Sequence, residues 1–236
     1  MNSELETKKT KIMLNTKDMT VGSGKVKPVM DAGNHVIRIN SITFDKTPYD
    51  AEAYNILLHV ETEPINTDFE GFLLDVNKPN GSRYEGQVGR VRFAPFPYKN
   101  ATLTSGREID RDTEVMKAMI YLSEVLNMRN ELDALQAKEI EDFMIKCNDL
   151  FSNSTWFNAC IGGKEWENKD GYINQDLFLP RMSKDGIPLE ALDIENSRLV
   201  TFNKEDHIIP PRKVGNKTVS NFEPVSTNGT ADDFDL

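Results

Sequence analysis

HVIRINSITF, residues 35–44, is the stretch that decides the fold. Its apolar side chains alternate with polar ones, but the phase slips by one residue halfway along, as shown by Ile37 and Ile39 followed by Ile42 and Phe44. Alternation with period two is typical of a strand with one buried face, and a slip of one residue is what a β-bulge produces. The pattern predicts a strand with a bulge at Asn40 and Ser41, as in strands that bend around a small barrel.

The segments on either side predict the remaining elements. Further strands are expected over residues 54–63, 69–76, 86–93, 156–161 and 172–179, and amphipathic helices over residues 112–127 and 131–151. Three strands, two helices and a hairpin follow one another in the order of an OB-fold. We therefore expect a mixed β-barrel with helices: an OB-fold-like five-stranded barrel with a helical insertion between strands 3 and 4, at about residues 110–152.

Length and composition favour one domain of residues 28–211 between two polar ends. A chain of 236 residues with 38% hydrophobic residues can bury one core. Residues 1–27 are expected to form a flexible N-terminal arm, and residues 212–236 a disordered acidic C-terminal tail. Neither a secretory signal nor an apolar run of roughly 20 residues is found. We expect a cytoplasmic protein with no membrane partner.

Chemistry-bearing motifs are sparse. Cys147 and Cys160 are too few for a disulfide framework, and three scattered histidines give them no metal-ligand spacing. Buried free cysteines usually act as small apolar side chains. The sequence has no nucleotide loop, no HExxH motif and no nucleophile with a paired base. We expect a protein that is not an enzyme and that has no cofactor and no metal site.

Positive charge is concentrated in one segment of this acidic chain. The formal net charge is −10, yet residues 78–99 carry five cations against Glu85 alone. Binding to phosphates requires a local positive potential, and in salt only a nearby patch contributes. This segment is the one that a polyanion could use.

An OB-fold binds its ligands across strands 2 and 3 and between the loops that join strands 1 to 2 and 4 to 5. Here the two loops are expected at residues 45–53 and 162–171. Aromatic rings in such a groove stack on bases, and cations bind phosphates. The candidate nucleic-acid-binding residues are Lys46, Tyr49, Lys78, Arg83, Tyr84, Arg90, Arg92, Phe96, Tyr98, Lys99, Lys164, Trp166 and Lys169.

Each of these features has a structural alternative. Arg90 and Arg92 could only shield a sheet surface, and Phe93 is expected in the core because it alternates with Val91. Binding to bases and packing within the protein are equal alternatives for Phe96 and Tyr98. The same holds for Trp166, whose ring could cap the barrel.

The chain ends in an acidic cluster with apolar side chains: Asp232, Asp233, Phe234, Asp235 and Leu236. Such an end is often only a solubilising tail. Phe234 and Leu236 are not needed for solubility, however, and a partner protein could bury them while basic residues take the carboxylates. The tail could also compete with nucleic acid for the protein's own groove.

Three segments, together with this end, carry a resemblance to a family. GNHVIRINSI (33–42), EGQVGRVRFAPFPY (85–98) and GGKEWENKDGYINQDLFLP (162–180) resemble single-stranded DNA-binding proteins of tailed bacteriophages, particularly crAss-like phages. The resemblance implies an OB-fold that coats single-stranded DNA during replication, recombination or repair in the cytoplasm of the infected bacterial host. It also implies that the acidic tip contacts replication or recombination proteins. Bacterial tips of this type end in Pro-Phe, whereas Phe234 is followed by Asp235 and Leu236.

The function predicted from the sequence is sequence-independent binding of single-stranded DNA, with the tail recruiting partner proteins. Homo-oligomerisation is left open. The alternative is a phage structural or assembly protein that uses the barrel for protein–protein contacts; it predicts no salt-dependent binding of oligonucleotides.

Overall fold

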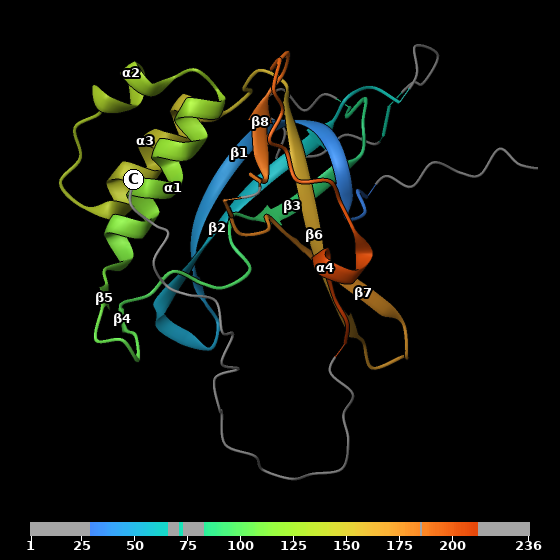
Figure 1. Ribbon diagram of the computed structural model, residues 1–236, viewed down its shortest axis with the longest axis horizontal. Coiled ribbons are helices and arrows are strands. Elements are labelled where there is room, and N and C mark those ends of the chain that lie inside the picture. The colour runs from blue at the N-terminus through green and yellow to red at the C-terminus, as the bar shows by residue number, and fades with distance from the viewer. Residues whose placement is uncertain (1–28, 66–70, 73–82, 185, 212–236) are drawn as a thin grey trace, which may run out of the picture.

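A computed structural model describes residues 29–65, 71–72, 83–184 and 186–211. Its centre is a ring-shaped sheet of five strands: β1 (Gly33–Thr47), β2 (Asp50–Thr62), β3 (Val88–Arg92), β6 (Phe157–Glu167) and β7 (Ile173–Phe178). Neighbours run in the order β1, β2, β3, β7, β6, and β1 also pairs with β6, so that the ring closes (Figure 1). All these pairs are antiparallel except β3 with β7.

The long strand β1 belongs to both sides of the ring. Its first half, Gly33–Ile37, pairs with β6, and from Ile37 to Thr47 it pairs with β2. The register with β2 shifts between Ile39 and Ser41, which leaves Asn40 as the extra residue. The bulge predicted from the slipped alternation is thereby confirmed, and it keeps the isoleucines on both sides of it in the core.

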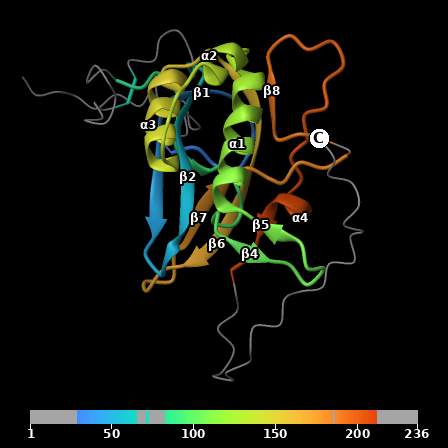
Figure 2. The ribbon, with the colours of Figure 1, turned by 90° about the vertical axis from the view of Figure 1, so that its left-hand side faces the viewer.

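Three helices lie between β3 and β6 in the chain and cover one side of the ring: α1 (Arg111–Val125), α2 (Arg129–Asp133) and α3 (Ile140–Phe151) (Figures 1 and 2). One continuous helix was predicted for residues 131–151, and this was wrong. The chain leaves the helix after Asp133 and starts again at Ile140. The intervening residues 134–139 include neither glycine nor proline, so no local signal marked the break.

α3 covers the part of the β1 edge that does not pair with β6. Beyond Ile37, no strand among the described residues pairs with β1 on this edge. The backbone N–H of Ile42 donates to Asn148 Oδ1 at 2.7 Å, and that of Ile39 donates to Ser154 Oγ at 2.9 Å. Exposed strand edges bind other chains, and covering one with a helix is a common remedy. The helical segment therefore completes the sheet as well as its core.

Smaller elements surround this framework. The hairpin β4 (Ala101–Thr102) and β5 (Glu108–Ile109) precedes α1, and β8 (Leu189–Ala191) extends the sheet beside β6. The chain then forms α4 (Lys204–His207) and β9 (Ile208–Ile209), which pairs in parallel with β6 at Gly163 and Lys164. The predicted strand at residues 69–76 lies almost wholly outside the described residues.

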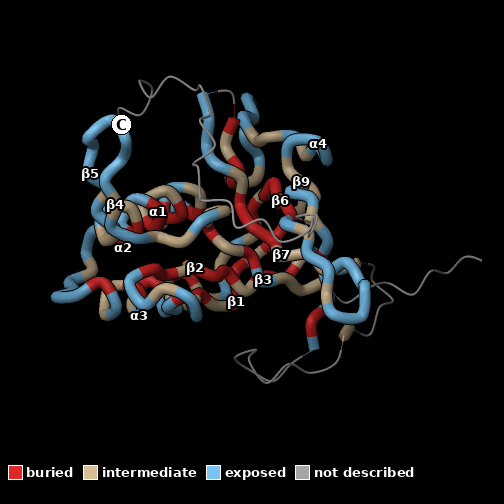
Figure 3. Tube along the Cα trace, turned by 90° about the horizontal axis from the view of Figure 1, so that it is seen from below, coloured by how far each residue is buried: buried red, intermediate tan, exposed pale blue. Residues whose placement is uncertain are grey.

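One hydrophobic core fills the ring and the layer beneath the helices. Ile37, Leu58 and Val91 face inward from three strands and are inaccessible to solvent, as are Leu122 and Phe151 from the helices. Figure 3 shows these buried stretches running along β2, β6 and α1. The core fixes which residues of each strand point outward.

A buried polar group fixes the bulge. Glu61 on β2 is 1% exposed, and its carboxylate accepts from Arg38 Nη2 at 2.9 Å and from Asn40 Nδ2 at 3.0 Å. Arg38 also lies over the ring of Trp156, with Cζ 4.9 Å from the ring centroid. Glu61 thus connects β2 to the bulged residue Asn40 and to Arg38, which precedes the bulge in β1.

Glu61→Ala is expected to lower the free energy of unfolding by about 1–3 kcal/mol, because the buried amide of Asn40 and the half-buried guanidinium of Arg38 lose their acceptor. Urea denaturation followed by circular dichroism measures the change. Glu63→Ala, which removes an exposed carboxylate two residues away, is the matched control and should stay within about 0.5 kcal/mol of the unmodified chain. Equal effects of the two substitutions would contradict a structural role for Glu61.

Candidate functional site

The outer faces of β2, β3 and β7 form a groove of about 620 Å3. Val91 points into the core, so its neighbours Arg90 and Arg92 point outward, as predicted from the alternation. The register places Arg90 opposite His59 and Arg92 opposite Leu57 on β2. Arg90 is exposed and Arg92 is half-buried. The groove therefore carries two guanidinium groups among apolar lining residues such as Leu57 and Leu177.

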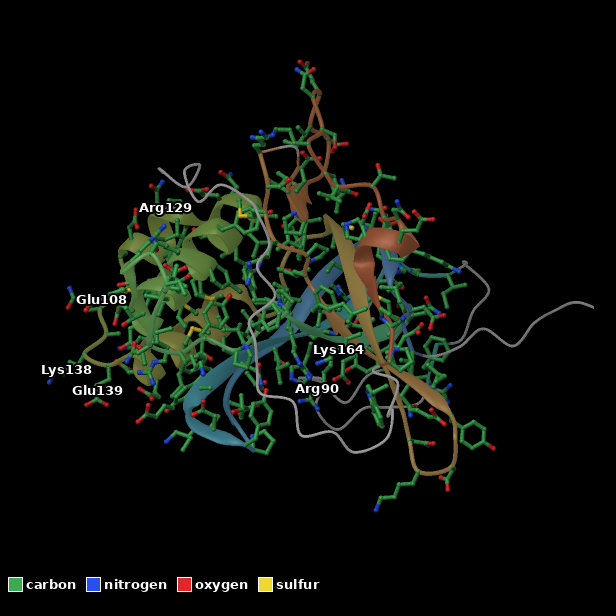
Figure 4. The ribbon with its side chains drawn as sticks, turned by 60° about the horizontal axis from the view of Figure 1, so that its bottom comes forward. Arg90, Glu108, Arg129, Lys138, Glu139 and Lys164 are labelled. Atoms are coloured by element: carbon green, nitrogen blue, oxygen red, sulfur yellow. The ribbon has the colours of Figure 1, made fainter. Side chains whose placement is uncertain are left out.

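One carboxylate connects this cationic face to an aromatic ring. Asp176 on β7 accepts from Arg92 Nη2 through Oδ2 at 2.8 Å, and from the indole Nε1 of Trp166 through Oδ1 at 3.1 Å. Lys164 lies in register with Asp176 on β6. In Figure 4, Arg90 and Lys164 lie in the region between the β1–β2 hairpin and the β6–β7 hairpin. Asp176 holds an arginine and a tryptophan that come from distant parts of the sequence.

The β6–β7 hairpin extends beyond the ring with exposed aromatic side chains. Trp166 is 44% exposed and Tyr172 is 69% exposed. Asn168 Oδ1 accepts from the N–H groups of Asp170 and Tyr172, and Gly171 has a positive φ of 82°. Tyr172 was not among the predicted site residues, although its position directly after the Asp-Gly turn could have indicated it.

The predicted loops at the two hairpins are shorter than expected. β1 runs to Thr47 and β2 begins at Asp50, so Lys46 lies on a strand. β6 runs to Glu167, so Lys164 and Trp166 also lie on a strand, while Lys169 is exposed in the turn. Gly162 and Gly163 were read as the start of a loop. Instead, their missing side chains leave room for Phe178 and Gln175 of the paired strand.

The β1–β2 hairpin carries a second group of cations and rings. Tyr49 at its tip is 73% exposed. Lys46 Nζ and Arg111 Cζ lie 5.6 Å and 4.6 Å from the centroid of the Tyr54 ring. Lys99 lies nearby, with Nζ 3.7 Å from Asp50 Oδ2. The sequence analysis missed Arg111, which comes from the start of α1 and reaches the hairpin only through the fold.

The remaining predicted rings are not equally accessible. Phe96 is 62% exposed, with Arg181 Cζ 5.4 Å from its ring centroid. Tyr84 is only 7% exposed, although it lines the groove. Tyr98 packs against the hydrophobic core, and burial raises the pKa of its hydroxyl. Phe96 therefore offers a face for stacking, whereas Tyr84 and Tyr98 offer little.

The other predicted residues lie at or beyond the boundary of this region. Arg83 is exposed, and its Nη1 donates to the carbonyl of Gly71 at 3.4 Å. Lys78 and the tail residues Asp232–Leu236 lie outside the described residues.

A second hollow of about 550 Å3 lies where the 202–210 segment meets the sheet. Its charged lining consists of Asp31, Glu165 and Glu205 against Lys204. This excess of carboxylates disfavours an anionic ligand. The groove over β2, β3 and β7 is therefore the better candidate for binding a polyanion.

Residues 29–65, 71–72, 83–184 and 186–211 contain no cluster of three or more histidine, cysteine or acidic side chains placed to hold a metal ion. Within the same residues, no helix is both long and apolar enough to cross a membrane. Both cysteines are buried, and burial raises the pKa of Cys147 to about 12 and that of Cys160 to about 11.

Comparison with known proteins gives no relative for this chain. No protein family matches it, and neither a curated protein nor a solved structure is significantly similar to it. The assignment of a function therefore rests on the geometry of the site.

Both thiols are expected to be almost unreactive at pH 8 in the folded protein, because the raised pKa values keep them protonated. Ellman's reagent should label neither cysteine in the native chain and both after unfolding in guanidinium. Rapid labelling of the native chain at either position would contradict the burial described above.

Proposed function

We propose that this protein binds single-stranded DNA without sequence specificity along the groove over β2, β3 and β7. We also propose that the ring of five strands is an OB-fold, which is a five-stranded Greek-key barrel. The closed ring of five strands and the helices between its third and fourth strands support that assignment. OB-folds bind oligonucleotides across strands 2 and 3 and between the two flanking hairpin loops.

The observation that carries the proposal is that cations and exposed rings from both hairpins flank the outer face of β2 and β3. Arg90 and Arg92 lie on that face. Trp166 and Tyr172 lie on the β6–β7 hairpin, and Tyr49 lies on the β1–β2 hairpin. Both hairpins project towards the lower side of the ring in Figure 1, with β3 between them. A single strand can offer phosphates and unstacked bases to this arrangement together.

Stacking and charge make separate contributions to the affinity for a single strand. A base stacked on an aromatic side chain is worth roughly 1–3 kcal/mol whichever base it is, because every base has a π face. Cations that bind phosphates release counterions, so affinity falls as salt rises. Paired bases of a duplex hide their faces, which favours single strands at this site.

In this proposal the protein acts in phage DNA replication, recombination or repair, in the setting that the resemblance implies. The acidic residues Asp232–Leu236 then recruit a replication or recombination protein. The alternative role as a phage structural or assembly protein predicts that the groove does not bind oligonucleotides at low salt.

Arg90→Ala should weaken binding of oligo-dT and flatten its salt dependence. The slope of log K against log salt is about −0.7 per phosphate contact for single strands, so losing one contact should reduce its magnitude by about 0.7. Fluorescence anisotropy of a labelled oligonucleotide at four salt concentrations measures both effects. Arg129→Ala is the control, because Arg129 lies on the helical side of the molecule (Figure 4) and pairs with Asp133 and Glu124. No binding by the unmodified chain at low salt would contradict the proposed function.

Trp166→Ala should reduce the affinity for oligo-dT by about 5- to 150-fold, the range that loss of one stacked base implies. The ligand-induced quenching of tryptophan fluorescence should also disappear, because the other tryptophan, Trp156, lies beneath Arg38. Trp156→Phe, which keeps an aromatic ring beneath the guanidinium, should retain both the affinity and the quenching. Quenching that survives in Trp166→Ala would place the bound strand elsewhere.

A further inference from the structure

A carboxylate is an unexpected group in a groove for phosphates. Asp176 lines the groove together with Arg90 and Arg92, and its side chain is 40% exposed. Like charges repel, so a phosphate bound directly against this carboxylate would lose affinity. We therefore expect the part of the ligand next to Asp176 to present a base to it rather than a phosphate.

Two hydrogen bonds hold the Asp176 carboxylate in place and leave some of its lone-pair positions free. An ionised carboxylate has about four lone-pair positions on its two oxygens. Among the described residues, Arg92 Nη2 occupies one position on Oδ2 and Trp166 Nε1 occupies one on Oδ1. One acceptor position on each oxygen then remains for a ligand. The two contacts hold the oxygens in place, so little rotamer freedom is lost on binding.

The bases differ in what they offer to two adjacent acceptors. Guanine presents N1–H and N2–H2 side by side on the edge that is free in a single strand. Thymine presents one N–H between two carbonyl oxygens, and adenine and cytosine each place a ring acceptor beside their amino group. Only guanine satisfies both oxygens without bringing an acceptor against the carboxylate.

We propose that Asp176 is a specificity-determining residue that gives the groove a local preference for guanine over thymine. The inference rests on the proposed function and adds a position-dependent base preference to otherwise unspecific binding. Trp166, held by the same carboxylate, is placed to contact the base that Asp176 binds.

The test compares the full-length chain with Asp176→Asn on two oligonucleotides of equal length: oligo-dT, and the same strand with isolated guanines spaced too sparsely to form quadruplexes. Competition measured by anisotropy should show that the unmodified chain prefers the guanine-bearing strand by about fivefold or more, the lower end of what a bidentate contact to a base edge supplies. Replacing guanine by inosine, which lacks the N2 amino group, should remove most of the preference.

Asp176→Asn should abolish the preference, because the amide presents an NH2 donor in place of one of the two acceptor oxygens. The preference is the ratio of the affinities for the two strands, so a change in overall affinity that is common to both strands does not affect it. Asp170→Asn is the matched control: it makes the same chemical change in the exposed turn of the same hairpin and should keep the preference. Thermal melting followed by circular dichroism confirms that both variants are folded.

The outcomes separate the two proposals. If the unmodified chain binds both strands equally, or if Asp176→Asn strengthens binding to both by the same factor, Asp176 only offsets positive charge and the inference is overturned. If the unmodified chain binds neither strand, the proposed function itself fails.

Discussion

The structure depends on one strand having two partners. β1 pairs with β6 through Gly33–Ile37 and with β2 from Ile37 onward, and these two ladders close the ring. A straight strand with strict alternation would have turned the second half of its apolar residues towards solvent. The extra residue at Asn40 corrects the phase, and Glu61 holds the bend by accepting from Asn40 itself and from Arg38, two residues before it. The same closure brings β7 beside β3, and with it Asp176 beside Arg92.

The helices reconcile an acidic chain with a cationic groove. The first turns of α1 and α3 carry Asp112, Glu114, Glu141 and Asp142, whereas Arg90 and Lys164 lie across the ring from them (Figure 4). Interactions between exposed charges are largely screened beyond about 10 Å at 0.1 M salt. A ligand in the groove therefore experiences the nearby guanidinium groups more strongly than the net charge of −10. The helices complete the core, and none of their carboxylates lines the groove over β2, β3 and β7. At the β1–β2 hairpin, however, Asp112 pairs with Arg111, and Glu141 accepts from the Tyr54 hydroxyl.

Features set by local periodicity could be predicted from the sequence, whereas contacts between distant segments could not. The slipped alternation located the bulge, and the alternation around Val91 placed Arg90 and Arg92 on the outer face. Nothing local marked Tyr98 as packed against the core, because its burial follows from its pairing with Tyr54. The contacts of Asp176 also escaped prediction: they depend on a parallel pairing of only two residues between β3 and β7, which no pattern in either segment specifies.

The candidate site combines two kinds of recognition that follow from one strand register. Arg90 is exposed and opposite His59, so it can follow a phosphate backbone whatever the sequence. Two residues further along β3, Arg92 is already paired with Asp176, and part of its charge is neutralised within the protein. A partly exposed ion pair of this kind adds little to stability. Its more distinctive consequence is geometric: it fixes a carboxylate beside an indole ring, on a surface that also carries the guanidinium groups of Arg90 and Arg92. Under the proposed function, a groove with this arrangement would attract any single strand but would not treat every base alike.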